Sequence, residues 1–206
     1  MALIIFDYDG VLADTLDDLI HFGQEACDQL GVKHAVTQAD LSNLEVMSFA
    51  TYGRACEVPE PLIDDFVKIS LNLFAEKKSP PAIFDEMSEV IQHFSGQHKL
   101  AIVTTNSSQN VKLFLARHGL SDLFHAVYGV DTPGSKAQKI SLAQERFREQ
   151  SVFMIGDALS DVRAAKEAGV TSIAITWGHQ GLETLLRGEP DYVVNHPREL
   201  IQVIER

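Results

Sequence analysis

Near the N-terminus the chain reads Leu3-Ile4-Ile5-Phe6-Asp7-Tyr8-Asp9-Gly10-Val11-Leu12. Its uninterrupted apolar run predicts a strand buried on both faces. Residues two apart in a strand point to the same side, so Asp7 and Asp9 could converge just past the strand, where Gly10 permits a sharp turn. Two such carboxylates can seat a hard divalent cation, or act as a nucleophile beside an acid or base. Taken alone, the segment also fits an ordinary polar turn.

Length, composition and charge are those of a globular protein that binds small molecules rather than polyanions. The chain has 206 residues, 45% hydrophobic and 22% charged, enough for one large domain or a core with a modest insertion. The formal net charge of −12 argues against nucleic acid or an anionic membrane as a partner, because either favours a basic surface. A site for an anionic substrate would therefore need a metal ion or a well-placed lysine.

Targeting signals and cysteine usage favour a cytoplasmic location. The N-terminus lacks the basic region of a signal peptide, and its apolar run is interrupted at Asp7. No apolar stretch approaches the roughly 20 residues that a membrane span requires. Cys27 and Cys56 fall in no metal-binding or redox pattern, so we expect reduced, mostly buried thiols.

From Leu16 to about Lys78 the sequence has helical spacing and predicts no strand. We expect helices over residues 16–30, 41–55 and 61–76, the first capped by Asp14 or Thr15 and ended by Gly31. Ser79-Pro80-Pro81 interrupts the helical pattern. The interpretation is an all-helical insertion over residues 14–80, with hinges near residues 13–15 and 79–81.

Strands and helices alternate in the remainder of the chain. Strand-like runs are expected at residues 100–103, 126–128, 152–155, 172–175 and 192–194. Helices are expected at residues 83–94, 109–118 and 136–149. A further helix ends at Ala168, and a last helix lies at the C-terminus. This alternation predicts right-handed crossovers and a mostly parallel sheet covered on both faces. The expected fold class is α/β: a Rossmann-like, doubly wound core of residues 1–13 and 81–206 with an inserted all-helical unit.

Polar residues follow three of these expected strands, at the edge where parallel sheets form functional crevices. Thr104, Thr105 and Asn106 follow the second long strand, and hydroxyls, amide and backbone N–H groups at a helix start suit a phosphate. Lys136 could neutralise a transferring phosphoryl group. Asp157 and Asp161 follow the third strand and offer hard oxygen ligands. Each group alone also fits a cap or a surface residue; together they favour a single site.

These motifs, in this order, resemble the haloacid dehalogenase superfamily. The resemblance rests on Asp7-Tyr8-Asp9-Gly10-Val11-Leu12, Thr104-Thr105-Asn106, Lys136 and Gly156-Asp157-x-x-x-Asp161, and it covers essentially the whole chain. The helical insertion after the first motif is similar to the small helical cap domain of that superfamily. The run from Asp161 through Gly169 to Thr176-Trp177-Gly178 resembles its phosphoglycolate-phosphatase-like subgroup.

The resemblance implies a chemical role for each motif. Asp7 would attack phosphorus and form an aspartyl-phosphate, while Asp9 would protonate the leaving oxygen and then activate water. Mg²⁺ would sit on the Asp7 carboxylate, the Asp9 carbonyl and Asp157, with Asp161 in support. Thr104 and Lys136 would hold the phosphoryl oxygens, with Lys139 as the alternative lysine. The full phosphate-binding set implied is Gly10, Thr104, Thr105, Asn106 and Lys136.

The expected function is therefore hydrolysis of a small phosphorylated metabolite by a monomer or weak homodimer. Asp9 favours phosphoryl transfer over dehalogenation. The runner-up is a sugar phosphomutase of the β-phosphoglucomutase type, whose fourth motif often reads Glu-Asp-Ser, and a catalytically idle binding module is a further alternative. Arg54 and Lys33 are candidate substrate contacts from the cap, although surface positions are the simpler interpretation. His179 and Trp177 could line the entrance, or Trp177 could only pack.

Overall fold

The computed structural model describes residues 1–77 and 80–206, and its centre is a six-stranded sheet. The strand order is β5-β4-β1-β6-β7-β8, and every neighbouring pair is parallel. This confirms the α/β, doubly wound prediction. The strands are β1 (Ala2–Phe6), β4 (Lys99–Val103), β5 (Ala126–Tyr128), β6 (Ser151–Gly156), β7 (Thr171–Ile175) and β8 (Tyr192–Val194).

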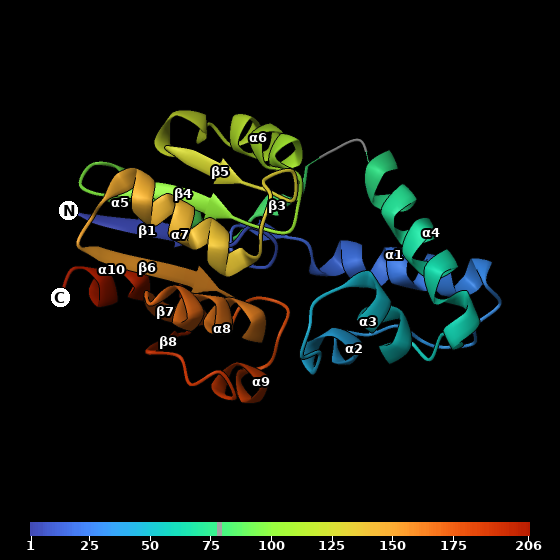
Figure 1. Cartoon of the computed structure of the whole chain (residues 1–206). Helices are drawn as coiled ribbons and strands as arrows, with labels where there is room; N and C mark the ends of the chain where they lie inside the picture. The colour runs from blue at the N-terminus through green and yellow to red at the C-terminus, as the bar shows by residue number, and fades with distance from the viewer. Residues whose placement is uncertain (78–79) are drawn as a thin grey trace.

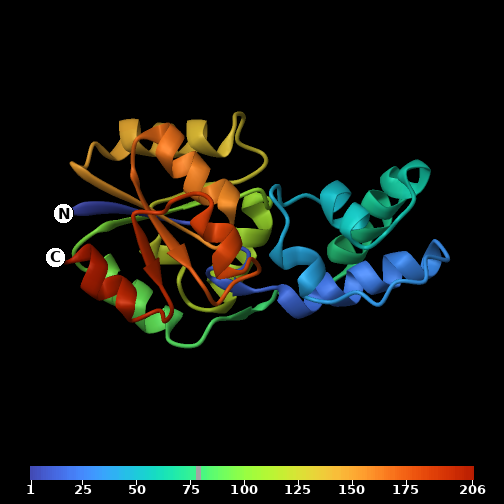
Figure 2. The same ribbon diagram turned by 90° about the horizontal axis from the view of Figure 1, so that it is seen from below.

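Alternate residues of β1 pack on opposite layers of helices, because successive strand side chains point to opposite faces. Ile4 and Phe6 belong to a cluster with α5 (Met87–Ser95), α6 (Ser108–Arg117) and α10 (Glu199–Ile204). Leu3 and Ile5 belong to a second cluster with α7 (Lys136–Phe147) and α8 (Leu159–Ala168). Figure 2 shows these two layers on either side of the sheet. Burial on both faces explains the continuous apolar run of β1. The short helix α9 (Leu182–Leu186) packs beside α8.

A separate helical unit, residues Leu16–Glu76, lies beyond one end of the sheet (Figure 1). It contains α1 (Leu16–Gln29), α2 (Ala39–Ser42), α3 (Phe49–Ala55), the 3₁₀ turn η1 (Glu60–Leu62) and α4 (Ile63–Glu76). Its apolar cluster, which includes Ala26, Cys27, Tyr52, Cys56 and Phe66, is separate from the two sheet clusters. Both thiols are buried and unpaired, as expected.

The single helix predicted over residues 41–55 is wrong, because the structure has two short helices with a loop at 43–48. Ser48 begins α3: its side chain accepts the backbone N–H of Thr51, and the Thr51 hydroxyl accepts the N–H of Ser48, a reciprocal capping box. The cap fixes a helix start in the middle of a segment whose apolar spacing alone is continuous.

Two short strands connect the helical unit to the core. β2 (Ala13–Asp14) and β3 (Ala82–Ile83) pair antiparallel, Ala13 with Ile83 and Asp14 with Ala82. The helix predicted from Ile83 therefore starts too early, since α5 begins only at Met87. The preceding residue, Glu86, has a φ of 64°, outside the helical region. Ser79, part of the predicted second hinge, lies outside the described residues.

The six strands of the parallel sheet direct their carboxyl ends toward the helical unit, and both chain termini lie at the opposite end of the core (Figure 1). Polar residues that follow the strands therefore lie between the sheet and the helical unit. Within residues 1–77 and 80–206, no helix is long and apolar enough to span a membrane.

Candidate active site

The turn after β1 presents Asp7 and Asp9 at the carboxyl edge of the sheet. The N–H of Asp7 donates to the Ile155 carbonyl at 2.8 Å, and the Tyr8 carbonyl then accepts the N–H groups of residues 11–13. Gly10 has a φ of 77°, and a Cβ built there would lie 2.1 Å from Oδ2 of Asp157. Only glycine suits this position, because it combines a left-handed backbone with the close approach of a carboxylate.

Three buried carboxylates converge beyond β1 and β6. Oxygen atoms of Asp7, Asp157 and Asp161 all lie within 4.8 Å of one another, and we call these residues the acidic cluster. Lys136, at the start of α7, places Nζ 3.1 Å from Oδ2 of Asp7 and forms a second ion pair with Asp161. Lys139 instead donates to the carbonyl of Gly129 at 2.7 Å. Of the two lysines considered from the sequence, the structure brings Lys136 to the carboxylates.

Charge in the acidic cluster is only partly compensated. Burial raises the pKa of Asp7 to about 8, although Lys136 opposes the shift, and burial together with Asp161 raises the pKa of Asp157 to about 7. Burial disfavours the charge of Lys136, but Asp161 and Asp7 outweigh it and hold the pKa of the lysine above its usual value. One lysine thus faces three carboxylates.

A divalent cation fits this arrangement. Among the described residues, the buried Oδ1 of Asp7 has no hydrogen-bond partner. Buried acceptors are normally satisfied, so an unpaired oxygen on a carboxylate of the acidic cluster is consistent with a site for a hard cation. The donors are all oxygens, which is the set that Mg²⁺ prefers.

Asp9 lies beside the polar residues that follow β4. Nδ2 of Asn106 donates to Oδ2 of Asp9 at 3.0 Å, and burial raises the pKa of Asp9 although this hydrogen bond opposes the shift. Oγ1 of Thr104 is buried and accepts the N–H of Asn106 at 3.0 Å. Thr105 is exposed. A carboxyl group that favours its protonated form can donate a proton during a reaction.

Sequence reasoning missed the position of His179, in the loop after β7. Only 3% of its surface is exposed, so it does not line an entrance. Its N–H and Nδ1 lie 2.8 and 3.2 Å from Oδ2 of Asp157, and Nε2 lies 3.1 Å from Oγ1 of Thr15. Gly178 permits this approach, because a Cβ there would lie 2.3 Å from Cβ of Asp157. The sequence signal that could have indicated this contact is the glycine followed by two polar residues, Gly178-His179-Gln180, shortly after β7.

The other residues considered for the entrance and the cap lie elsewhere. Nε1 of Trp177 donates to the Val11 carbonyl at 3.3 Å, and its ring packs against the sheet cluster. Arg54, near the end of α3, forms a two-pronged ion pair with Glu60 at 2.6 and 2.9 Å. Lys33 is exposed in the loop after α1. The structure therefore brings neither Arg54 nor Lys33 to the acidic cluster.

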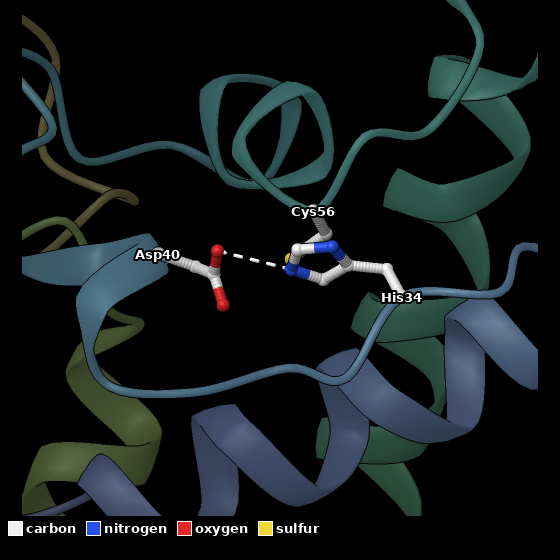
Figure 3. Close-up of side chains that lie close together, drawn as sticks. All are labelled: His34, Asp40 and Cys56. Carbon is white, nitrogen blue, oxygen red and sulfur yellow. Dashed lines mark hydrogen bonds and ion pairs between the residues drawn. The ribbon is translucent and has the colours of Figure 1, made fainter.

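A second group of metal-ligand side chains, His34, Asp40 and Cys56, lies inside the helical unit (Figure 3). Both oxygens of Asp40 are engaged there: Oδ1 pairs with Nε2 of His34 at 3.0 Å, and Oδ2 accepts the N–H of Thr37 at 2.7 Å. Cys56 is part of the apolar cluster, and burial raises its pKa. These contacts stabilise the loop before α2 and account for all three residues.

A parallel sheet with acids, a lysine and a hydroxyl at its carboxyl edge is typical of an α/β enzyme. The model of the haloacid dehalogenase-like hydrolase family matches residues 4–175, so the chain belongs to that family and the resemblance seen in its motifs is confirmed. Curated relatives of the chain include proteins named as phosphatases.

Two curated relatives named phosphoglycolate phosphatase show the extent of the similarity. The protein from Synechococcus elongatus is 26% identical, over 99% of this chain and 97% of its own length. That from Vibrio vulnificus is 28% identical, over 99% and 96%. Among solved structures, a haloacid dehalogenase-like hydrolase from Streptococcus pneumoniae superposes with a TM-score of 0.85 at 24% identity, covering 98% of this chain and 97% of that one. The fold is thus shared along the whole chain.

Proposed function

We propose that the protein hydrolyses a small phosphomonoester with Mg²⁺, through an aspartyl-phosphate intermediate on Asp7. The observation that carries this proposal is the state of the Asp7 carboxylate. One oxygen faces Lys136 at 3.1 Å, and the other is buried without a hydrogen-bond partner among the described residues. A carboxylate held beside a cation, with an unoccupied oxygen, suits nucleophilic attack and metal binding together.

The residues that would hold the metal are the side chains of Asp7 and Asp157 and the backbone carbonyl of Asp9. Asp161 would support them, since its carboxylate pairs with Lys136 and accepts the N–H of Ala158 at 3.1 Å. Bound there, Mg²⁺ supplies positive charge that offsets the acidic cluster and the phosphoryl oxygens.

In the first half of the reaction, a carboxylate oxygen of Asp7 forms a bond to phosphorus while the bond to the leaving oxygen breaks. Lys136 neutralises charge on the phosphoryl group, and the Thr104 hydroxyl donates its proton to one of the phosphoryl oxygens. The backbone N–H groups of Gly10 and Asn106 are already donated, to the Ala13 carbonyl at 2.9 Å and to Oγ1 of Thr104 at 3.0 Å. Asp9 gives its proton to the leaving oxygen, aided by the pKa that burial raises.

In the second half, water attacks phosphorus and the bond to Asp7 breaks. Asp9, now ionised, accepts the proton of that water and returns to its starting state. Asn106 keeps the Asp9 carboxylate oriented through the 3.0 Å hydrogen bond to Oδ2. Inorganic phosphate leaves.

The insertion predicted over residues 14–80, which contains the helical unit, would act as the cap that closes over this site. It lies beyond the carboxyl ends of the strands and connects to the core through β2 and β3. Closure would exclude water during attack by Asp7 and select the leaving group. The curated relatives make phosphoglycolate the first substrate to test.

Phosphate release from a panel of phosphomonoesters with Mg²⁺ tests the proposal, with wild type beside Asp7→Asn. We expect phosphoglycolate or another small metabolite to be hydrolysed by the wild type, and the variant to lose essentially all turnover because its amide is a poor nucleophile. Substantial turnover by Asp7→Asn would exclude the covalent mechanism. Bisphosphate-dependent isomerisation of glucose 1-phosphate would instead indicate a mutase.

A further inference from the structure

Among residues 1–77 and 80–206, one residue outside the acidic cluster holds the carboxylate of Asp157. His179 approaches it twice, through its backbone N–H at 2.8 Å and through Nδ1 at 3.2 Å. Both contacts go to Oδ2, so rotation of the carboxylate is restrained and Oδ1 is the oxygen left for a cation. This is the arrangement in which a residue behind a metal ligand orients it.

The other edge of the same imidazole faces the helical unit. Nε2 of His179 lies 3.1 Å from Oγ1 of Thr15, the residue at the N-cap position of α1. Within the described chain, the Thr15 side chain makes no capping hydrogen bond to α1, although hydroxyls at this position commonly do. The hydroxyl instead lies beside His179 and the Asp9 carboxylate. With Nδ1–H donating to Asp157, Nε2 accepts the hydroxyl proton of Thr15, and a neutral ring satisfies both partners.

The loop after β7 contacts the helical unit at a second place. The Ser42 carbonyl accepts the Gly181 N–H at 3.3 Å and the Thr184 hydroxyl at 3.0 Å. The Gln180 side chain donates to the Leu44 carbonyl and accepts the Leu159 N–H at 2.7 Å. These bonds hold the α2 end of the helical unit against the core without a contact to Asp157; the Ser42 hydroxyl also donates to the backbone carbonyl of His179 at 3.4 Å.

We propose that His179 is a positioning residue that couples closure of the helical unit to the orientation of Asp157. When the start of α1 lies against the core, the Thr15 hydroxyl fixes the imidazole of His179. The imidazole in turn orients the Asp157 carboxylate so that Oδ1 is free for a cation. When α1 moves away, Nε2 loses its partner and Asp157 loses a restraint. The coupling rests on the proposed role of Asp157 as a metal ligand.

Calorimetric titration of the metal-free protein with Mg²⁺ tests the coupling directly. His179→Ala removes the ring from both partners, and we expect the Mg²⁺ affinity to fall about 10-fold or more, as for other residues that orient metal ligands. Thr15→Val removes only the hydroxyl, and it should lower the affinity in the same direction by a smaller factor. Thr15→Ser restores the hydroxyl and should restore the affinity.

Thr184→Val is the matched control, because it also deletes one hydroxyl between core and helical unit. It should loosen the Ser42 contact, seen as faster proteolysis of residues 37–48, and leave the Mg²⁺ affinity unchanged. His179→Ala with Thr15→Val should bind Mg²⁺ as His179→Ala alone does, since the second change removes a partner that is already lost.

Two outcomes overturn the coupling: an unchanged affinity in Thr15→Val, or additive losses in the double variant. Asp157→Asn separates this failure from failure of the proposed function. If Asp157→Asn abolishes Mg²⁺ binding while the His179 and Thr15 variants bind normally, only the coupling is wrong. If Asp157→Asn also binds Mg²⁺ normally, the proposed metal site is wrong.

Discussion

At the scale of single residues, Gly10 allows the turn after β1 to lie close to Asp157, which follows β6. A side chain there would meet Oδ2 of Asp157 at 2.1 Å and would have to adopt a φ of 77°. Gly10→Ala should therefore lower turnover strongly and reduce the free energy of unfolding by about 1 kcal/mol or more. Phosphatase assays and urea unfolding measure the two effects.

Gly119→Ala separates the backbone cost from the collision. Gly119 has a similar φ of 68°, but no atom lies within 4 Å of the Cβ that alanine would add. This control should lose only the backbone part of the free energy of unfolding, about 1 kcal/mol, and keep normal turnover. Equal loss of turnover in both variants would contradict a specific role for the contact between Gly10 and Asp157.

The two lysines of α7 provide a second prediction at this scale. Lys136→Ala should reduce turnover by about 100-fold or more, because Lys136 is the cation beside Asp7. Lys139→Ala should instead reduce the free energy of unfolding by about 1–3 kcal/mol, since the Gly129 carbonyl loses its donor. Steady-state kinetics and urea unfolding of both variants check the assignment. A turnover loss confined to Lys139→Ala would reverse it.

The sequence predicts the positions of site residues well where the alternation of side chains along a strand and the order of the strands determine them. Asp7, Asp157 and Asp161 meet because parallel strands β1 and β6 are neighbours and end at the same edge. The choice between Lys136 and Lys139 stayed open, because residues three apart lie on nearby faces of a helix. His179 was placed in the wrong environment, since the path of an irregular loop is set by long-range contacts such as that with Thr15.

At the scale of elements, the division between α2 and α3 depends on the Ser48 capping box. Ser48→Ala should reduce the free energy of unfolding by about 1 kcal/mol, because the Thr51 N–H loses its acceptor. Urea unfolding provides the measurement. Ser95→Ala, which removes a hydroxyl near the end of α5, is the comparison and should be nearly neutral. Equal losses in the two variants would argue against the cap.

The type of an element could be predicted where its apolar run was long. Its boundaries could not be predicted where local hydrogen bonds, such as a helix cap, set the end of the element. The strands at residues 99–103, 126–128 and 151–156 match the expected positions within a residue. β2 and β3 were missed because two-residue strands have no periodicity to detect; they exist through pairing across almost 70 residues of chain.

At the scale of the whole molecule, the acidic cluster should make stability depend on pH and on Mg²⁺ together. The pKa values of Asp7 and Asp157 rise from 3.8 to about 8 and about 7 on folding. The folded protein therefore binds more protons than the unfolded chain between about pH 4 and pH 8, and metal-free stability should fall as pH rises through that window.

Thermal unfolding at a series of pH values, with and without saturating Mg²⁺, measures this linkage. The increase in Tm caused by Mg²⁺ should be larger at pH 8 than at pH 5.5, because protons compete with the cation for the same carboxylates. Asp157→Asn removes one titrating group and should flatten the metal-free profile. A Mg²⁺ effect that does not vary with pH would contradict a site built from Asp7 and Asp157.

The pairing of β2 with β3 has an evolutionary and practical consequence. The chain leaves the core at Asp14 and returns at Ala82, and these residues are direct cross-strand partners, whose Cα atoms lie about 5 Å apart in such ladders. A two-residue hairpin turn could join them. The helical unit has its own apolar cluster, separate from those of the sheet. Helical units of different size could therefore be inserted between Asp14 and Ala82 without a change in the packing of the sheet or in the position of the acidic cluster.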